Sequence, residues 1–347
     1  MKKTIVLIFA VCFFAGITAY AADRPFSVPA KSPKINPLLL DRVQELSIEE
    51  KIKVWVFFTD KGMFDSTTFN NVIDNLRQQA SPRTIARRRN RAKKDELFDF
   101  YDIPVNQDYL NQLRNIGVKI VRQSRWLNAV SVLTDKFSIQ SIAGLPFVAE
   151  IRPVAVARRK PEKIEPVNIP EMPDTFKPDA AIPDSVADWY GNSFTQLDLT
   201  NIPLLHQFGY TGEGVRIALL DAGFELNLPI FDSLNFIDQY DFVDDDPIAK
   251  DENSADENNH GTLVLSTIGG FAPDNLIGAA YDAEYLLART EFIGSETEVE
   301  EDNWVAAAEW ADSMEADIIS TSLGYYDWYE YSDLDGNTAV VTIAADL

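Results

Sequence analysis

The sequence predicts an α/β protein that combines two modules of different architecture. Residues 22–154 are expected to form an α+β module, because strand and helix patterns follow one another there in the order strand, helix, strand, strand, helix, strand. Residues 188–347 are expected to form a parallel-sheet module, because their strand-like segments are apolar runs that suit burial on both faces. A proline-rich linker, residues 155–187, separates the two modules.

The N-terminus is typical of a cleaved signal peptide, which we place at residues 1–21. Two lysines come first, an almost wholly apolar run covers residues 4–17, and residues 19–21 offer a small-x-small cleavage pattern. The apolar run is short for a helix that spans a bilayer. The sequence therefore predicts a secreted protein, and no later stretch indicates a transmembrane helix.

Charge and cysteine content exclude several classes of function. The formal net charge is -23, and its distribution is uneven, because residues 1–185 carry a net +7 and residues 186–347 a net -30. The acidic part should repel nucleic acid and anionic membranes, so neither is expected as a partner. The one cysteine, Cys12, lies inside the predicted signal peptide, which excludes disulfides, cysteine catalysis and thiolate metal sites from the mature chain.

The first module contains clear strand and helix signals. Residues 53–59 are rich in β-branched and aromatic side chains, as in a strand. Ser66 is a candidate N-cap for a helix that reaches about Gln79, and Gly117 should end a helix over 109–116. The other expected elements are strands at 118–122 and 127–133, a helix at 135–143 and a strand at 147–154. This order is that of the split-βαβ, ferredoxin-like fold.

One stretch of the first module, residues 81–94, carries seven basic side chains. A run of this kind is usual in a solvated helix or loop, which is the interpretation adopted here. A nucleic-acid-binding patch is the alternative, and the secretion signal argues against it.

The linker and the second module differ sharply in composition. Seven of the 18 prolines fall between residues 153 and 183, and proline resists both helices and central strands. Beyond the linker, residues 215–221 form an apolar run that ends in Asp221, as expected of a buried parallel strand. The other expected elements are helices at 202–208, 260–269, 303–314 and 339–347, and strands at 283–289 and 317–322.

Three short motifs stand at the ends of these strands and helices. They are Asp221-Ala222-Gly223 after the first strand, Asn259-His260-Gly261-Thr262 at the start of a helix, and Ser322-Leu323-Gly324 after a later strand. Ligands of open α/β sheets bind beyond the carboxyl ends of the strands, so we expect the motifs to share one site. An aspartate fixed at a strand end can hold a histidine in one tautomer and stabilise its charged form.

In this order the motifs resemble those of the subtilases, the subtilisin-like serine proteases, whose catalytic residues come in the order Asp, His, Ser. IALLDAGF resembles the strand with the catalytic Asp, NNHGTLVLSTIGG the helix with the catalytic His, and IISTSLG the strand whose end pairs with the substrate backbone. Upstream, VWVFFTD, SRWLNAVSV and LPFVAEIRPV resemble the family's propeptide, an intramolecular chaperone and inhibitor. The resemblance covers nearly all of the chain after the signal.

The resemblance implies a role for each motif. Asp221 would orient His260, and His260 would act as general base and then as general acid. Ser322, Leu323 and Gly324 would form an edge that binds a polypeptide substrate by β-augmentation. The implied fold is an incomplete parallel-sheet subtilisin-like domain, residues 188–347, preceded by an α+β ferredoxin-like propeptide domain, residues 22–154.

The sequence departs from the family pattern in two ways. Ala222 stands where many relatives carry Thr or Ser. No GTS-x-[AS]-x-P nucleophile motif and no oxyanion-hole Asn occur before the chain stops at Leu347, and Ser266 and Ser320 lack the flanking motif, so no nucleophile is assigned. Acyl transfer then lacks its attacking group and its main electrostatic stabiliser, and the 347-residue chain alone is expected to be inactive and poorly folded.

No cofactor and no metal site are expected, with one alternative kept open. The segment 241–258 is rich in carboxylates that suit Ca²⁺, but it has no EF-hand spacing, and a solvated acidic loop is the other interpretation. His206 is expected to be a partly exposed helix residue, and nothing indicates a metal site with His260. The acids at 296–302 complement the positive end of the helix that follows them.

The sequence thus predicts the precursor of a secreted serine endopeptidase, with polypeptide substrates and its own propeptide as partners. Two alternatives stay open: a propeptide-like inhibitor or chaperone of another protease, and an inactive pseudoprotease. The reading frame beyond codon 347 discriminates between enzyme and binding module, because an intact triad serine favours the first and a stop at Leu347 favours the second.

Overall fold

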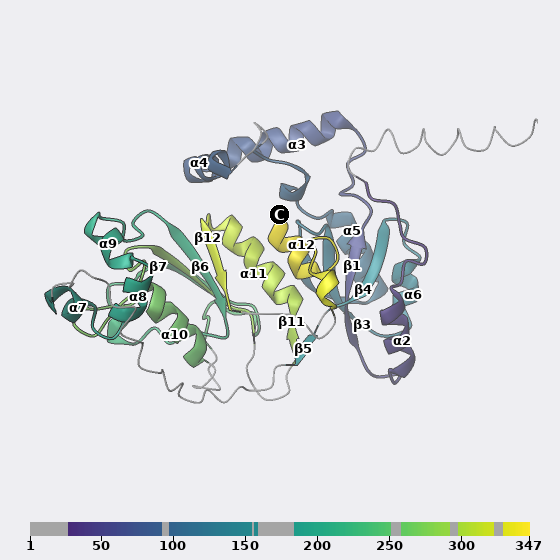
Figure 1. The fold of residues 1–347 in the computed structure, drawn as a ribbon. Helices are drawn as coiled ribbons and strands as arrows, with labels where there is room; N and C mark the ends of the chain where they lie inside the picture. Colours follow the sequence, from purple (N-terminus) through teal and green to yellow (C-terminus); the bar gives the residue numbers. More distant parts are fainter. Residues whose placement is uncertain are drawn as a thin grey trace, which may run out of the picture. The chain divides into compact units, whose positions relative to one another are not determined.

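The computed structural model describes residues 27–91, 97–154, 156–158, 184–250, 258–291, 298–322 and 329–347 (Figure 1). The chain divides into two compact units, the first ending at Val154 and the second running from Ala155 to Asp346. The predicted signal peptide and most of the predicted linker lie outside the described residues. Among the residues that are described, no helix has both the length and the apolar character that a membrane span requires.

The first unit is built on one antiparallel sheet. Its elements are α2 (Pro37–Glu45), β1 (Ile52–Phe58), α3 (Ser66–Gln79), α4 (Pro82–Arg91), η1 (Phe100–Asp102), α5 (Gln107–Ile116), β2 (Lys119–Ser124), β3 (Ala129–Thr134), α6 (Ser138–Ala143) and β4 (Val148–Pro153). The strand order is β2-β3-β1-β4, and every neighbouring pair is antiparallel. This is the predicted ferredoxin-like arrangement.

The core of the first unit lies on one face of this sheet. Alternate residues of β1, namely Val54, Val56 and Phe58, are buried in one cluster with residues of α5 and α6 such as Leu113 and Ile139. Burying a side chain of this size stabilises the folded state by about 1.5–3 kcal/mol. The alternation of side chains along β1 sets which of them face this cluster, but Trp55 on the opposite face of β1 is fully buried as well.

Local hydrogen bonds set the helix ends in this unit. The N-cap of α3 is Asp65 rather than the predicted Ser66, because the Asp65 carboxylate accepts from the backbone N–H of Thr68 at 2.8 Å. Helix α5 ends as predicted at Gly117, whose φ of 94° lies in the left-handed region that glycine adopts without strain.

The basic run proves to be a helix, α4, and part of its charge is used inside the unit. Arg88 forms an ion pair with Asp102 at 2.7 Å, and its guanidinium lies 4.5 Å from the centre of the Phe98 ring. Arg87 is buried as well. The prediction of a solvated helix or loop is therefore wrong at these two arginines, and Arg88 packs against the segment that follows α4.

The second unit is built on a parallel sheet. Its elements are β5 (Val156–Arg158), α7 (Asp184–Tyr190), α8 (Phe194–Leu199), α9 (Ile202–Gln207), β6 (Arg216–Asp221), η3 (Pro229–Phe231), β7 (Asn235–Asp241), α10 (Asn258–Gly269), β8 (Phe271–Ala272), β9 (Leu276–Ile277), β10 (Glu284–Arg289), β11 (Glu298–Glu300), α11 (Glu301–Ser313), β12 (Ile318–Thr321), η4 (Tyr331–Asp333) and α12 (Val340–Asp346). The main sheet has the order β12-β6-β10-β7, with all neighbours parallel, which confirms the predicted α/β class.

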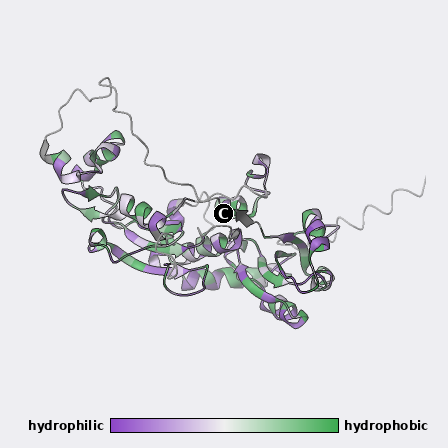
Figure 2. Ribbon diagram, turned by 90° about the horizontal axis from the view of Figure 1, so that it is seen from below, coloured by the Kyte–Doolittle hydropathy of each residue, from purple (hydrophilic) through white to green (hydrophobic). Residues whose placement is uncertain are grey.

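Strand β6 lies inside this sheet, and both of its faces are buried. Ile217 and Leu219 join one apolar cluster with Leu265 of α10, while the alternate residues Ala218 and Leu220 are also buried. Both α10 and α11 contact β6. Figure 2 shows apolar and polar stretches on the same helices, as expected of helices with one buried face.

Strand β12 differs from its prediction. The run 317–322 was expected to be buried, yet Ile318 is 50% exposed and Ile319 37% exposed. Within the described residues β12 has β6 as its one strand neighbour, so it forms an edge of the sheet and leaves apolar side chains open to solvent. Apolar composition indicates a strand here but does not reveal its place in the sheet.

Candidate active site

Asp221 ends β6 at an interior position of the parallel sheet. Its side chain is buried, and its Oδ1 accepts a hydrogen bond from the Ala222 N–H at 2.8 Å. Its backbone carbonyl accepts from the N–H of Thr290, just beyond the neighbouring strand β10, at 2.9 Å. The end of β6 and the residue after it therefore hold the carboxylate in one orientation.

Helix α10 brings His260 to this carboxylate. The helix begins at Asn258, two residues before its predicted start, and His260 lies in its first turn. The next residue, Gly261, is packed so tightly that an added Cβ would lie 2.3 Å from the Gly223 carbonyl oxygen and 3.1 Å from Asp221 Cβ. A residue without a side chain is thus required for the helix to approach the end of β6 this closely.

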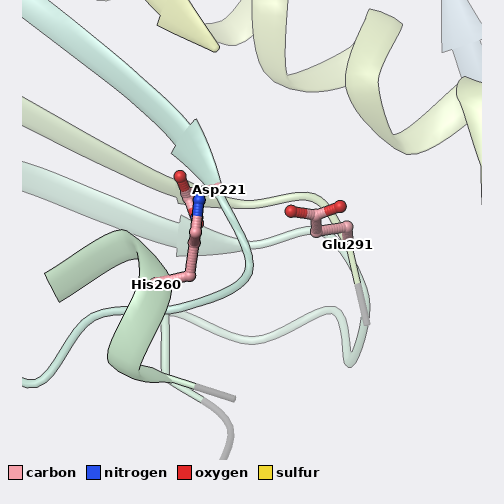
Figure 3. A group of neighbouring side chains, drawn as sticks. All are labelled: Asp221, His260 and Glu291. Carbon is pink, nitrogen blue, oxygen red and sulfur yellow. The ribbon is translucent and has the colours of Figure 1, made fainter. Parts of the chain in front are cut away.

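The two predicted catalytic residues meet. His260 Nδ1 lies 2.7 Å from Asp221 Oδ1 (Figure 3). The Asp221 side chain is 2% exposed and the His260 side chain 31% exposed, so the imidazole is open to solvent on one side. A carboxylate that accepts from Nδ1–H leaves the lone pair on Nε2, which makes Nε2 the basic atom of the ring.

A third side chain at this place, Glu291, was not predicted. It follows β10, is 2% exposed, and offers a carboxylate oxygen that lies within 4.8 Å of ligand atoms of Asp221 and His260 (Figure 3). A signal existed in the sequence, because 283–289 was expected to be a parallel strand and Glu291 stands just beyond its carboxyl end. That β10 lies next to β6 was not evident from the sequence.

Comparison with known proteins identifies both units. A family model described as "Peptidase S8 propeptide domain, Bacteroidota" matches residues 53–166, and one described as "Subtilase family" matches residues 212–345. Residues 212–345 are therefore a subtilase-family segment. Asp221, His260 and Glu291 all lie within the segment that the second model matches.

The chain matches only part of the length of its curated relatives. Minor extracellular protease Vpr of Bacillus subtilis is 34% identical over 136 residues, which are 37% of this chain and 16% of that protein. Subtilisin E of Bacillus subtilis is 24% identical over 209 residues, which are 60% of this chain and 45% of that protein. The chain therefore spans less than half the length of either relative.

The structure of this chain also aligns with solved structures of other proteins. Fervidolysin from Fervidobacterium pennivorans, a keratinolytic enzyme related to subtilisin, aligns with a TM-score of 0.47 and 14% identity, covering 85% of this chain and 37% of that chain. The epidermin leader peptide processing serine protease of Staphylococcus aureus aligns with a TM-score of 0.43 and 13% identity, covering 79% and 50%.

The third subtilase motif is only partly described. Ser322 directly follows β12, the neighbour of β6, and is exposed. Leu323 and Gly324 lie outside the described residues. A substrate-binding role for these three residues stays a prediction.

The acidic segment that suggested Ca²⁺ is tied to an arginine instead, over the part that is described. Arg289 is fully buried, and its guanidinium contacts Asp241 at 2.7 Å and Asp244 at 2.6 Å. It also donates from Nε to the Ala222 carbonyl at 3.2 Å, so it supports the loop that follows Asp221. Residues 251–257 lie outside the described part of the chain, and a bound Ca²⁺ stays an open alternative to the expectation of no cofactor.

His206, the second histidine of the chain, has contacts at both ring nitrogens. Its Nδ1 lies 2.7 Å from the Tyr190 hydroxyl, and its Nε2 lies 3.0 Å from the Ala279 carbonyl oxygen. Since a carbonyl only accepts, the proton sits on Nε2 and the tyrosine donates to Nδ1. These contacts fix the position of helix α9 against the segment before β10, which is a structural role.

Proposed function

We propose that this chain is part of the precursor of a secreted serine endopeptidase, in which Asp221 and His260 are two members of an Asp-His-Ser triad. The observation that carries the proposal is the 2.7 Å contact between Asp221 Oδ1 and His260 Nδ1 inside the subtilase-family segment. The apolar N-terminal run supports secretion.

The proposed chemistry assigns one task to each group. His260 Nε2 removes the proton of the serine hydroxyl as that oxygen attacks a peptide carbonyl, and it then returns the proton to the leaving amine. Asp221 keeps the ring in the required tautomer and stabilises the imidazolium without taking the proton itself. The solvent-facing side of His260 is the side from which a substrate would approach.

The serine of this triad is not assigned to any residue of the chain. Without an attacking oxygen and an oxyanion donor, the 347-residue chain should not hydrolyse peptides. Hydrolysis of a casein substrate by the purified 347-residue chain, sensitive to a serine-protease inhibitor, would contradict this part of the proposal.

The first unit is proposed to be the propeptide that chaperones and inhibits the subtilase domain. Its sheet and core and the propeptide-family match support this role. The opposite net charges, +7 for residues 1–185 and -30 for residues 186–347, would speed the encounter of the two parts. Affinity of the separated parts should therefore fall as salt is added, and a salt-independent affinity would contradict the electrostatic contribution.

A propeptide-like inhibitor of another protease is the second candidate function. The observation that favours it is that the first unit has an apolar core cluster made up of its own residues. The two candidates separate when the reading frame is sequenced beyond codon 347. A GTS-x-[AS]-x-P segment there supports the enzyme, whereas a stop supports the inhibitor.

The catalytic assignment is tested on the product of the complete reading frame. Asp221→Ala should lower kcat/KM by about 10⁴-fold and His260→Ala by about 10⁶-fold. Glu213→Gln, which removes one charge from an exposed turn before β6, is the matched control and should leave the rate unchanged. Near-normal activity in either of the first two variants would remove the proposed triad.

A further inference from the structure

Three side chains that commonly bind metals converge at the carboxyl ends of two adjacent strands. Asp221 comes from the end of β6, Glu291 from just beyond β10, and His260 from the first turn of α10. One ligand atom of each lies within 4.8 Å of the corresponding atoms of the other two (Figure 3). The parallel pairing of β6 with β10, which sets Asp221 opposite Arg289, is what brings Glu291 to this place.

The charge of this group favours a divalent cation. Asp221 is 1% exposed and Glu291 2% exposed, so two carboxylates are held close together away from solvent. Two carboxylates so close together attract a divalent cation more strongly than one carboxylate does. One M²⁺ ion would neutralise both carboxylates, and the neutral imidazole would complete a ligand set without net charge.

The kind of ligand selects the kind of metal. Ca²⁺ and Mg²⁺ prefer oxygen ligands alone, whereas Zn²⁺ accepts imidazole nitrogen together with carboxylate oxygen. Three protein ligands with a fourth position open to solvent are usual for zinc at reactive sites. The 31% exposed side chain of His260 gives an ion a route from solvent to the two buried carboxylates.

We infer that Asp221, His260 and Glu291 form a binding site for Zn²⁺ or a similar transition-metal ion. Occupancy engages the imidazole that the proposed mechanism needs as a base, so the ion acts as a reversible inhibitor of the peptidase. The inhibitory consequence rests on the proposed function, whereas the binding site does not. A site with one imidazole needs only His260, which is why the absence of a second nearby histidine does not argue against it.

Binding is measured on the purified chain after treatment with a chelator, once circular dichroism has shown that the chain is folded. Co²⁺ is added first, because its visible absorption reports the ligand geometry, and Zn²⁺ is then used to displace it. One ion per chain is expected. Glu291→Gln should weaken binding by more than about 100-fold, because it removes a direct ligand and not just a group that hydrogen-bonds to a ligand. His260→Gln should abolish the Co²⁺ spectrum. Glu213→Gln removes one carboxylate charge elsewhere and should change nothing.

Two results of the binding experiment would contradict the metal site. Binding that is unchanged in both Glu291→Gln and His260→Gln places the ion elsewhere and overturns the inference, as does no binding at millimolar Co²⁺ and Zn²⁺. Because Glu291 is buried, circular dichroism checks the fold of each variant, and His260→Gln carries the test if Glu291→Gln is unfolded.

The inhibitory role is tested separately on the product of the complete reading frame. Zinc should inhibit peptide hydrolysis, and a chelator should restore it. Zinc binding that leaves hydrolysis unchanged would overturn the inhibitory role alone. Zinc binding by a complete product that hydrolyses no peptide would overturn the proposed function while supporting the metal site.

Discussion

Each unit contains a buried carboxylate that pairs with an arginine, yet the two carboxylates differ in their pKa. In the first unit, Glu150 of β4 contacts Lys31 and Arg152, both at 2.8 Å. Burial is the largest single influence and would raise the pKa of Glu150, but the hydrogen bonds and charges of Arg152 and Lys31 together hold it below its ordinary value. The ionised form of Glu150 therefore stabilises the folded first unit.

In the second unit the balance is reversed at Asp241. Burial again has the largest influence on its pKa, and here it prevails, so the pKa of Asp241 is raised although Arg289 and the N–H groups of Asp244 and Val243 act in the opposite direction. Asp241 shares its cation, because Arg289 also pairs with Asp244. At Glu150 two cations act on one carboxylate, and together they outweigh the effect of burial on its pKa. At Asp241 one cation is shared by two carboxylates, and burial prevails.

The two units also hold buried cations in different ways. Lys61 of the first unit donates to the backbone carbonyls of Phe100 at 2.7 Å and Arg125 at 2.8 Å, and to that of Ile103 as well. Arg289 of the second unit is held mainly by carboxylates. Both cations connect loops at strand ends, but carbonyl dipoles do not titrate, whereas carboxylates do.

Among the changes that test this comparison, the largest loss of folding stability is expected for Arg289→Met. This change leaves Asp241 buried without its guanidinium, which should lower the free energy of unfolding of the second unit by about 3–5 kcal/mol. Hydrogen exchange of the β6 and β10 amides measures the change. Lys250→Met removes the same charge from a partly exposed pair with Glu225 and should cost no more than about 1 kcal/mol. Equal effects of the two variants would refute the special role of the buried pair.

A smaller loss of folding stability is expected for Lys61→Met in the first unit. Three backbone carbonyls, of which that of Ile103 is buried, lose their donor, which should cost about 2–3 kcal/mol once water has partly replaced it. Hydrogen exchange of the β1 and β3 amides reports this change. Lys119→Met, at the exposed start of β2, serves as the control and should have little effect. A neutral result for Lys61→Met would mean that the carbonyls find other donors.

Glu150→Gln tests, through the pH dependence of stability, whether the ionised form of Glu150 stabilises the first unit. At neutral pH the loss of a charged acceptor should cost about 1–2 kcal/mol. Since the folded pKa of Glu150 is lowered, its contribution is complete above the unfolded pKa and is lost as pH falls through the folded pKa. Wild type and variant should therefore converge in stability in acid. A difference that persists at low pH would contradict this account.

The smallest effect is expected for the pH dependence of Asp241. Its raised pKa means that the folded state binds the proton more tightly, so its contribution to stability is present below the unfolded pKa and is lost as pH rises through the folded pKa. Asp241→Asn removes this titration and should make the stability of the second unit less dependent on pH above the ordinary aspartate pKa of about 4. An unchanged slope in amide exchange against pH would show that Asp241 is not the group responsible.

Much of the secondary structure was predictable, because its signals are local. The apolar run that ends in Asp221, the glycine after α5 and the His-Gly pair that opens α10 each act through neighbours in the chain. Strand β7 was not predicted, since Asn235–Asp241 is largely polar and exposed. Its place at the end of the sheet beside β10 explains why it needs little apolar surface.

In the candidate site, some residues could be predicted from the sequence and others only from the tertiary structure. The sequence alone predicted Asp221 and His260, because their motifs taken together, in this order, resemble those of the subtilases. Only the tertiary structure decided that Glu291 joins them, that Arg289 takes up Asp241 and Asp244, and that β12 is exposed. The physical reason is that caps and periodic patterns depend on residues a few positions apart. Which charges meet depends instead on which strands become neighbours, and the burial of the whole sheet sets that order.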